Sequence, residues 1–337
     1  MDHTFLFVAF IILIALLFDF TNGMHDAANS VATIVGTRTL TPRQAVLWAA
    51  FWNFVAYFMP FFGHEVAKTV GKGMVDIGVV TKTVVLAGLA GAIAWNLITL
   101  KLGLPTSSSH ALLGGYAGAA VARAGFGAII WSGWTKTLIF IGLAPAIGLV
   151  FGMALLCVSH WIIYFSKAAP NRVTKVSRLL QLGSAAAYSL GHGANDSQKT
   201  MGIIASLLVS AKIIDHFYIP VWVALAAYTA IGLGTYMGGW KIMKTMGNGI
   251  AKLWPVDGVC AEVASAISIF TATALGVPVS TTHVITGAIS GVGAAKRTSA
   301  VRWQITMQIV WAWVLTIPGA ALVASLGYFL LSRVAGP

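Results

Sequence analysis

The sequence predicts an all-α membrane protein that crosses the bilayer several times and is built from two repeats of inverted topology. Hydrophobic residues make up 58% of the chain and charged residues only 9%, which is unlike a soluble domain. Apolar runs of about 20 residues, long enough to cross a bilayer, recur along the whole length. Short motifs in the first half return in the same order in the second half.

The apolar segments form two sets in matching order. We place them at 4–21, 26–37, 43–63, 78–101, 105–122 and 131–165, and then at 179–191, 195–210, 219–240, 256–276, 278–294 and 303–331. The first segment lacks a basic flank and a small-residue cleavage pattern, so we interpret it as a retained membrane helix. Segment 131–165 contains a proline and is either one long tilted helix or two shorter ones. The chain therefore divides into a first repeat over 1–165, a short cytoplasmic connector over 166–178 and a second repeat over 179–337.

An acidic, glycine-containing motif occurs once in each half. Residues 22–29 read Asn-Gly-Met-His-Asp-Ala-Ala-Asn, and residues 192–199 read His-Gly-Ala-Asn-Asp-Ser-Gln-Lys. Because glycine weakens a helix, we expect one crossing helix to be broken at Asn22-Gly23 and its counterpart at 191–193. Irregular backbone at membrane depth is tolerated only where it is buried or lines a cavity. Paired interrupted helices of this kind predict a transporter binding site between the two halves.

A second repeated motif predicts two re-entrant hairpins. Residues 104–110 read Leu-Pro-Thr-Ser-Ser-Ser-His, and residues 277–283 read Val-Pro-Val-Ser-Thr-Thr-His. Proline ends the helix before it and is well placed to start the next one. If the two hairpins do not cross the membrane, each half crosses three times, and this odd number inverts the second half relative to the first.

The hydroxyl groups at the hairpin tips predict an anion site. A helix N-terminus offers free N–H groups and a positive dipole, and two of them facing each other could hold a tetrahedral oxyanion. The alternative is ordinary Ser/Thr packing between membrane helices. For His110 and His283 we expect hydrogen bonds that stabilise the hairpins. The candidate anion ligands are Thr106, Ser107, Ser108, Ser109, Ser280, Thr281 and Thr282.

Acidic residues inside membrane segments are costly and are functional candidates by default. Asp26 and Asp196 stand at equivalent positions, and with neighbouring amides they offer the oxygen ligands that hard cations prefer. The alternative for both is helix N-capping. Asp19 and Glu262 have no acidic counterpart in the other half, so they could serve either hydrogen bonding or cation and proton binding.

Three of the differences between the two acidic motifs bear on their chemistry. Asn22 matches His192, and His25 matches Asn195, so each copy has one amide and one imidazole in exchanged order. The two histidines could carry protons or act as neutral hydrogen-bonding groups. Lys199 stands where the first copy has an amide. It could replace a bound cation, contact the anion or pair with the neighbouring carboxylate.

The net charge of +12 predicts contact with anionic lipid headgroups rather than nucleic acid, since no basic stretch is interleaved with aromatic residues. If both termini lie outside, the inner loops hold 12 Lys and Arg residues and the outer loops seven. The positive-inside rule favours this orientation. Cys157 and Cys260 lack the spacing of paired ligands, so we expect neither a disulfide nor a structural metal site.

Both pairs of motifs resemble the inorganic phosphate transporter (Pit) family over nearly the whole chain. The resemblance implies two inverted repeats with re-entrant hairpins, a phosphate symporter coupled to sodium or protons, and commonly a homodimer. The His25 form is similar to the bacterial proton-coupled branch, in which a divalent metal–phosphate complex can be the transported species. The sodium-coupled branch usually has Asn where His25 stands.

We therefore expect a symporter that imports phosphate across a bacterial cytoplasmic membrane without a resident cofactor. The hydroxyl groups of the tips, and in one interpretation Lys199, would bind phosphate. The alternatives are a permease for sulfate or another oxyanion, a passive anion channel, and a membrane phosphatase, for which no nucleophile with an orienting base is visible. We expect the coupling cations or protons at Asp26, Asn29, Asn195 and Asp196, with His25, Asn22, Asp19 and Glu262 as further candidates.

Overall fold

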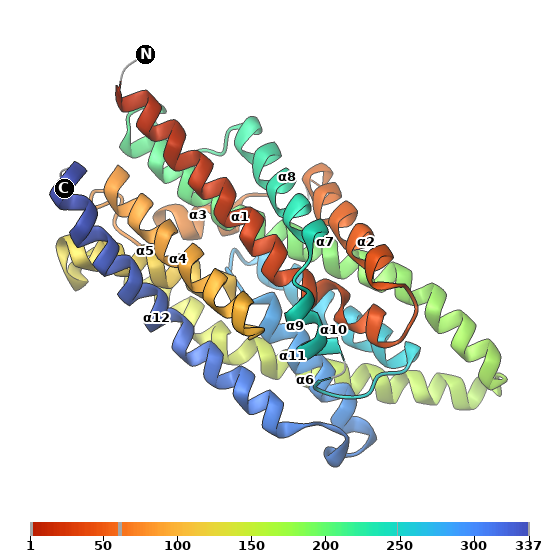
Figure 1. Cartoon of the computed structure of the whole chain (residues 1–337). Helices are drawn as coiled ribbons and strands as arrows, with labels where there is room; N and C mark the ends of the chain where they lie inside the picture. Colours follow the sequence, from red (N-terminus) through yellow and green to blue (C-terminus); the bar gives the residue numbers. More distant parts are fainter. Residues whose placement is uncertain (1–2, 60–62, 248, 336–337) are drawn as a thin grey trace.

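The computed structural model describes residues 3–59, 63–247 and 249–335, and these form long helices (Figure 1). Five of the helices are long and apolar enough to cross a membrane, namely α1, α4, α6, α10 and α12. The expectation of an all-α, multi-pass membrane protein is thus confirmed. The helices are α1 (His3–Gly36), α2 (Pro42–Val55), α3 (Glu65–Lys72), α4 (Lys82–Leu102), α5 (Ser108–Ala124), α6 (Trp131–Ser166), α7 (Pro170–Ser210), α8 (Val221–Met237), α9 (Trp240–Gly247), α10 (Pro255–Ala274), α11 (Thr281–Lys296) and α12 (Trp303–Ala335).

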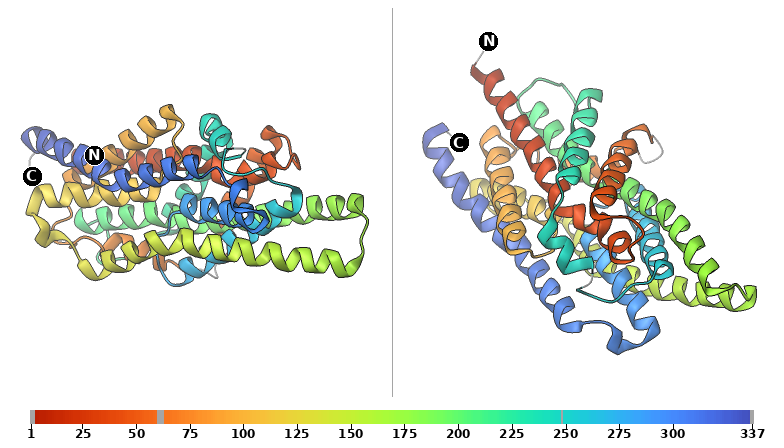
Figure 2. Two further views of the ribbon diagram at one scale, coloured as in Figure 1. Left: turned by 90° about the horizontal axis from the view of Figure 1, so that it is seen from below. Right: turned by 45° about the vertical axis from the view of Figure 1, so that its right-hand side comes forward.

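The order of helices in the first half recurs in the second half. Each half has a very long helix, a shorter helix, an eight-residue helix, a helical hairpin and a final long helix with a proline inside. Both ends of the chain lie at one end of the molecule, and the turn from α6 to α7 lies at the other (Figures 1 and 2). Residues 170–178 of the expected connector already belong to α7. The inverted relation of the halves stays a prediction.

The predicted breaks in the two long helices are wrong. Helix α1 runs through Asn22-Gly23, and α7 runs through residues 191–193. Both glycines allow neighbouring helices to approach closely. A Cβ at Gly23 would lie 2.2 Å from the carbonyl oxygen of Ile231 in α8, and one at Gly193 would lie 2.6 Å from that of Asn53 in α2. Close packing through small residues is common in membranes, and an unbroken helix keeps its backbone hydrogen bonds satisfied.

Two helical hairpins, α4–α5 and α10–α11, stand where the sequence predicts them, but their second helices start later than expected. Pro105 and Pro278 lie outside the helices, which begin at Ser108 and Thr281. The preceding serine caps each helix: the Ser107 hydroxyl accepts a hydrogen bond from the N–H of His110, and Ser280 does the same for His283. A serine N-cap satisfies a free donor of the first turn, which proline cannot do.

Residues 131–165 belong to one helix, α6, with Pro145 in its interior. Each hairpin packs against the long proline-containing helix of the other half: α5 against α12, and α11 against α6. Glycines allow the contact at equivalent places. A Cβ at Gly287 of α11 would lie 2.1 Å from the Pro145 carbonyl oxygen, and one at Gly114 of α5 would lie 2.6 Å from that of Ile317 in α12.

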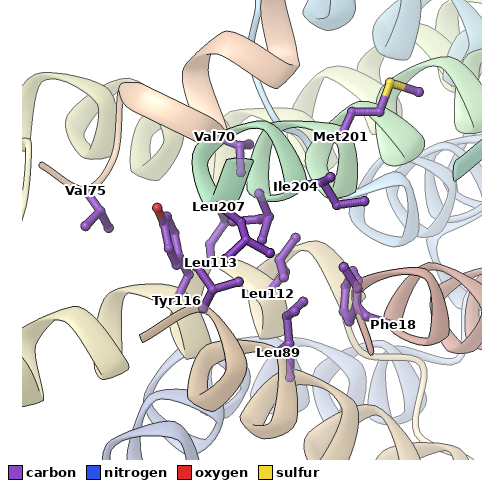
Figure 3. Close-up of a cluster of buried hydrophobic side chains, with 14 of the residues drawn as sticks. Phe18, Val70, Val75, Leu89, Leu112, Leu113, Tyr116, Met201, Ile204 and Leu207 are labelled. Carbon is purple, nitrogen blue, oxygen red and sulfur yellow. The ribbon is translucent and has the colours of Figure 1, made fainter. Parts of the chain in front are cut away.

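A buried apolar cluster holds the first hairpin against α1 and α7. Phe18 of α1, Leu89 of α4, Leu112 of α5 and Ile204 of α7 converge there, each at most 1% exposed (Figure 3). Val70 of α3 lies on the far side of α7 in the same cluster. This packing places the hairpin tip beside the middle of both long helices, where the two acidic motifs lie.

Candidate functional site

The predicted site residues lie in the interior, where the middle parts of α1 and α7 meet the two hairpin tips. Each of them is at most 3% exposed. They are Asp19, Asn22, His25, Asp26 and Asn29 of α1; Asn195, Asp196 and Lys199 of α7; Thr106, Ser107, Ser108 and Ser109 of the first hairpin; and Glu262, Ser280, Thr281 and Thr282 of the second.

Helical spacing brings the two acidic motifs together. Residues three and four apart share one face of a helix, so each motif presents its polar side chains along one stripe. The stripes meet at the carboxylates, where the Asn22 side-chain amide donates to Asp196 Oδ2 at 3.4 Å. His192 Nε2 lies 3.5 Å from Asp196 Oδ2 and 3.9 Å from Asp26 Oδ2. The two carboxylates therefore share one imidazole.

The first hairpin tip binds the α1 motif directly. The Ser108 hydroxyl lies 2.9 Å from Asp26 Oδ2 and is also bonded to the side-chain oxygen of Asn22. His25 Nδ1 lies 3.0 Å from Asp26 Oδ1, and its Nε2 lies 3.3 Å from the Thr106 hydroxyl. The hydroxyls predicted to hold an anion thus lie next to a carboxylate predicted to hold a cation.

The two hairpin tips also contact each other, by a reciprocal pair of hydrogen bonds. The Thr282 hydroxyl donates to the backbone oxygen of Thr106 at 3.1 Å. At the equivalent place in the other hairpin, the Ser109 hydroxyl donates to the backbone oxygen of Val279 at 3.3 Å. The Asn29 amide adds a bond from α1 to the Thr282 hydroxyl at 2.8 Å. The tips therefore form one polar layer at the centre of the protein.

Lys199 joins α7 to both tips. Its ammonium group lies 2.5 Å from Asp196 Oδ1, 2.5 Å from the Ser109 hydroxyl and 2.8 Å from the backbone oxygen of Val279. These three acceptors use all three donors of the ammonium group. The interpretation of Lys199 as the ion-pair partner of Asp196 is confirmed, and the same group lies against the predicted anion site.

Three predicted residues lie apart from this layer. The Asn195 amide donates to the Thr273 hydroxyl at 2.8 Å and so ties α7 to α10. Glu262 belongs to a separate cluster nearer the start of α7, where it accepts bonds from Thr33 and Ser184, both at 2.5 Å. Within the described part of the chain, both carboxylate oxygens of Asp19 are buried without a hydrogen-bond partner.

A model of the phosphate transporter family matches residues 22–324. The chain belongs to the phosphate transporter family. It is 53% identical to the "Probable low-affinity inorganic phosphate transporter" of Rhizobium meliloti (strain 1021), over 99% of this chain and 100% of the relative. The protein of the same name from Bacillus subtilis (strain 168) is 44% identical, again over 99% of this chain and 100% of the relative.

A solved structure described as "The sodium-dependent phosphate transporter" has the same fold. It matches with a TM-score of 0.87 and 25% sequence identity, and the match covers 97% of this chain and 99% of that one. The family and the relatives are transporters rather than enzymes. The resemblance drawn from the motifs is therefore confirmed, and so is the expectation that the chain is not an enzyme.

The interior polar layer also contains groups that could hold a metal ion. One ligand atom each from Asp26, His192 and Asp196 lies within 4.8 Å of the other two. Carboxylate and imidazole ligands suit divalent transition metals. The sequence predicts His192 as a possible proton carrier or neutral hydrogen-bonding group, and the structure places its imidazole within reach of both carboxylates.

Two polar residues that support the site were missed from the sequence. Asn53 of α2 lies 3.1 Å from His192 Nδ1, and its own amide donates to Thr235 of α8 at 2.9 Å. Thr99 of α4 lies 3.2 Å from His25 Nε2. Each is a polar residue in a largely apolar segment, which is a weak signal without a repeat to mark it. Both orient an imidazole of the site.

Proposed function

We propose that this protein is a secondary active symporter that imports inorganic phosphate together with cations across a bacterial cytoplasmic membrane. One observation carries the proposal. Ser108, at the start of α5, donates its hydroxyl to the Asp26 carboxylate, so the anion site and the cation site touch. Phosphate bound at the tip would lie beside this carboxylate, which a cation must first neutralise.

The fixed charges of the layer support cation coupling. Two carboxylates, Asp26 and Asp196, face one fixed cation, Lys199, which pairs with Asp196. With neutral histidines the layer is left with one negative charge before any anion enters. A proton or sodium ion on Asp26 would remove it. Phosphate then meets a layer of hydroxyls, helix N-termini and an ammonium group, which suits an oxyanion.

Phosphate entry requires the hairpin tips to separate. The hydroxyls of Ser109 and Thr282 donate to backbone oxygens of the opposite tip. A bound phosphate would take over these donors, so the bonds between the tips would break as the site fills. In this mechanism the bonds between the tips close the site, and the hairpins provide alternating access.

Phosphate uptake into vesicles tests the proposal. Asp26→Asn and Asp196→Asn should each abolish accumulation of phosphate against a gradient at matched membrane expression. The exposed loop residue Asp215 provides the matched control, and Asp215→Asn should transport normally. Undiminished accumulation in both site variants would refute the symport proposal. Uptake of phosphate measured with and without sodium at two pH values identifies the coupling ion. Competition by sulfate tests whether the protein also transports that oxyanion.

The cluster of Asp26, His192 and Asp196 favours a metal–phosphate complex as a second transported species. A divalent metal held by these three residues would offset the negative charge that remains after Lys199 pairs with Asp196. Uptake of radioactive zinc or manganese should then depend on phosphate, and phosphate uptake should rise with the metal. If His192→Asn abolishes metal uptake but spares phosphate uptake, the imidazole selects the metal. Metal uptake that is independent of phosphate would reject this species.

A further inference from the structure

The corner between α6 and α7 projects at the end of the molecule opposite to the chain termini (Figures 1 and 2). Three aromatic side chains near the end of α6 are strongly exposed: Trp161 by 71%, Tyr164 by 78% and Phe165 by 73%. Exposed tryptophan and tyrosine residues gather where a membrane protein passes from hydrocarbon to headgroups. They place this corner at the membrane–water boundary.

Basic residues follow this aromatic group immediately. Lys167, Arg172, Lys175 and Arg178 are all exposed, and none of them forms an ion pair in the part of the chain that the structure describes. The sequence contains no Asp or Glu between Asp76 and Asp196. A cluster of four basic residues directly beyond a membrane helix is a typical signal for anionic lipid.

A pocket of about 260 Å³ opens beside one of these basic residues, Arg172. Its walls come from three helices, with Ile163 from α6, Val173 and Val176 from α7, and Val259 from α10. Arg172 lines the same pocket. An apolar cavity with an unpaired guanidinium group in its wall suits a ligand with an apolar chain and an anionic head. Free phosphate would gain nothing from the apolar walls.

We propose that this pocket binds one anionic phospholipid, with an acyl chain between α6, α7 and α10 and the headgroup phosphate on Arg172. Guanidinium is well suited to phosphate because its planar donors can bind two oxygens at once. The lipid would contact α10, the first helix of the second hairpin, together with α7, which carries Asp196. It would therefore tie the second hairpin to α7, although the proposal does not depend on transport.

Native mass spectrometry of the purified full-length protein tests the proposal. The protein is equilibrated with equal amounts of phosphatidylglycerol and phosphatidylcholine, and the retained lipid is identified. Wild type should retain phosphatidylglycerol in preference. Arg172→Gln should lower this preference about fivefold, which corresponds to about 1 kcal/mol for one basic residue near a headgroup. Arg172→Lys, which keeps the charge, should retain most of it.

Lys212 provides the matched control, since it is an exposed basic residue just beyond the other end of α7. Lys212→Gln should leave the preference unchanged, and equal losses in the two glutamine variants would overturn the proposal. Val176→Trp fills the pocket and should lower lipid retention with Arg172 intact; unchanged retention would overturn the acyl-chain site. Displacement of phosphatidylglycerol by excess inorganic phosphate would show instead that Arg172 serves a free anion.

Discussion

The polar faces of α1 and α7 are equivalent in position but unequal in charge. Asn29 and Lys199 stand at matching places, and each reaches across to the hairpin of the other half, Asn29 to Thr282 and Lys199 to Ser109. The amide brings no charge, whereas the ammonium group lies 2.5 Å from Asp196. One half thus neutralises its own carboxylate with a permanent cation, and the other does not.

In the proposed mechanism, this difference gives the two carboxylates separate tasks. Asp26 is bonded to a hydroxyl, that of Ser108, and lies beside imidazole groups. It keeps a charge that only a mobile cation or a proton can remove. Asp196 is already paired, so it can hold Lys199 in place while phosphate enters. In the proposed mechanism, Asp26 senses the coupling ion and Asp196 positions the ammonium group for the anion.

Replacing Lys199 should have the largest effect. Lys199→Met leaves Asp196 as an unpaired buried charge, which costs about 3–5 kcal/mol of folding free energy. Asn29→Leu removes a neutral hydrogen bond at the matching place and should cost about 1 kcal/mol. Thermal unfolding of the purified variants measures both.

The double variant Lys199→Met, Asp196→Asn separates charge from packing. Because it removes both members of the ion pair, it should recover most of the stability lost in Lys199→Met while remaining inactive in phosphate uptake. If the double variant is as unstable as Lys199→Met alone, the ammonium group stabilises the protein mainly through its contacts with the hairpin tips. The difference in stability between the Asn29 and Lys199 variants would then not come from the buried charge of Asp196.

The motif glycines give a second comparison, because each packs against the shorter second helix of the other half: Gly23 against α8 and Gly193 against α2. Gly23→Ala would place a Cβ 2.2 Å from a backbone oxygen, and Gly193→Ala one at 2.6 Å. A backbone obstacle cannot rotate away, so each should cost about 3 kcal/mol, the upper part of the usual range for overpacking. Thermal unfolding should show a larger loss of stability for Gly23→Ala than for Gly193→Ala.

Gly183 of α7 provides the control, since a Cβ there would meet nothing within 4 Å. Gly183→Ala should be neutral or stabilising by up to about 1 kcal/mol, because alanine favours the helix. A loss of stability in Gly183→Ala equal to that in Gly193→Ala would mean that α7 needs flexible backbone at these glycines, as a broken helix would.

The glycines also show where sequence reasoning succeeds and where it fails here. The duplicated motifs predicted residues that the structure brings together in the interior, because carboxylates and hydroxyl runs in apolar segments have few uses other than a shared polar site. The same glycines led to the wrong prediction of broken helices. Glycine occurs both where the backbone is irregular and where two helices pack closely. Only the segment that packs against the glycine shows which of the two applies. For Gly23 that neighbour is Ile231, which lies over 200 residues away in the sequence.

The contacts of Asn53 and Thr99 could not be predicted from the sequence for the same reason. Asn53 and Thr99 support the two imidazoles of the site, yet nothing near them in the sequence points to a histidine on another helix. The exchanged order of Asn and His in the two motifs was visible, but its consequence was not. His25 faces the first hairpin through Thr106, whereas His192 lies between the two carboxylates.

A small expected effect on stability comes from Thr281, which begins α11 as Ser108 begins α5. Ser108 donates to Asp26, whereas the buried hydroxyl of Thr281, at the equivalent place, has no hydrogen-bond partner in the described part of the chain. Ser108→Ala should therefore cost about 1–2 kcal/mol, and Thr281→Val, which keeps the shape, should cost nothing measurable in thermal unfolding.

Phosphate uptake then decides what the Thr281 hydroxyl does. If Thr281→Val folds like wild type but raises the phosphate concentration needed for half-maximal uptake, the unused hydroxyl is kept for the substrate. Thr281→Ser, which keeps the hydroxyl, should transport normally. If Thr281→Val transports as well as wild type, the second tip binds phosphate through its backbone N–H groups and through Lys199. The hydroxyls of the two tips would then differ in function as clearly as the two carboxylates do.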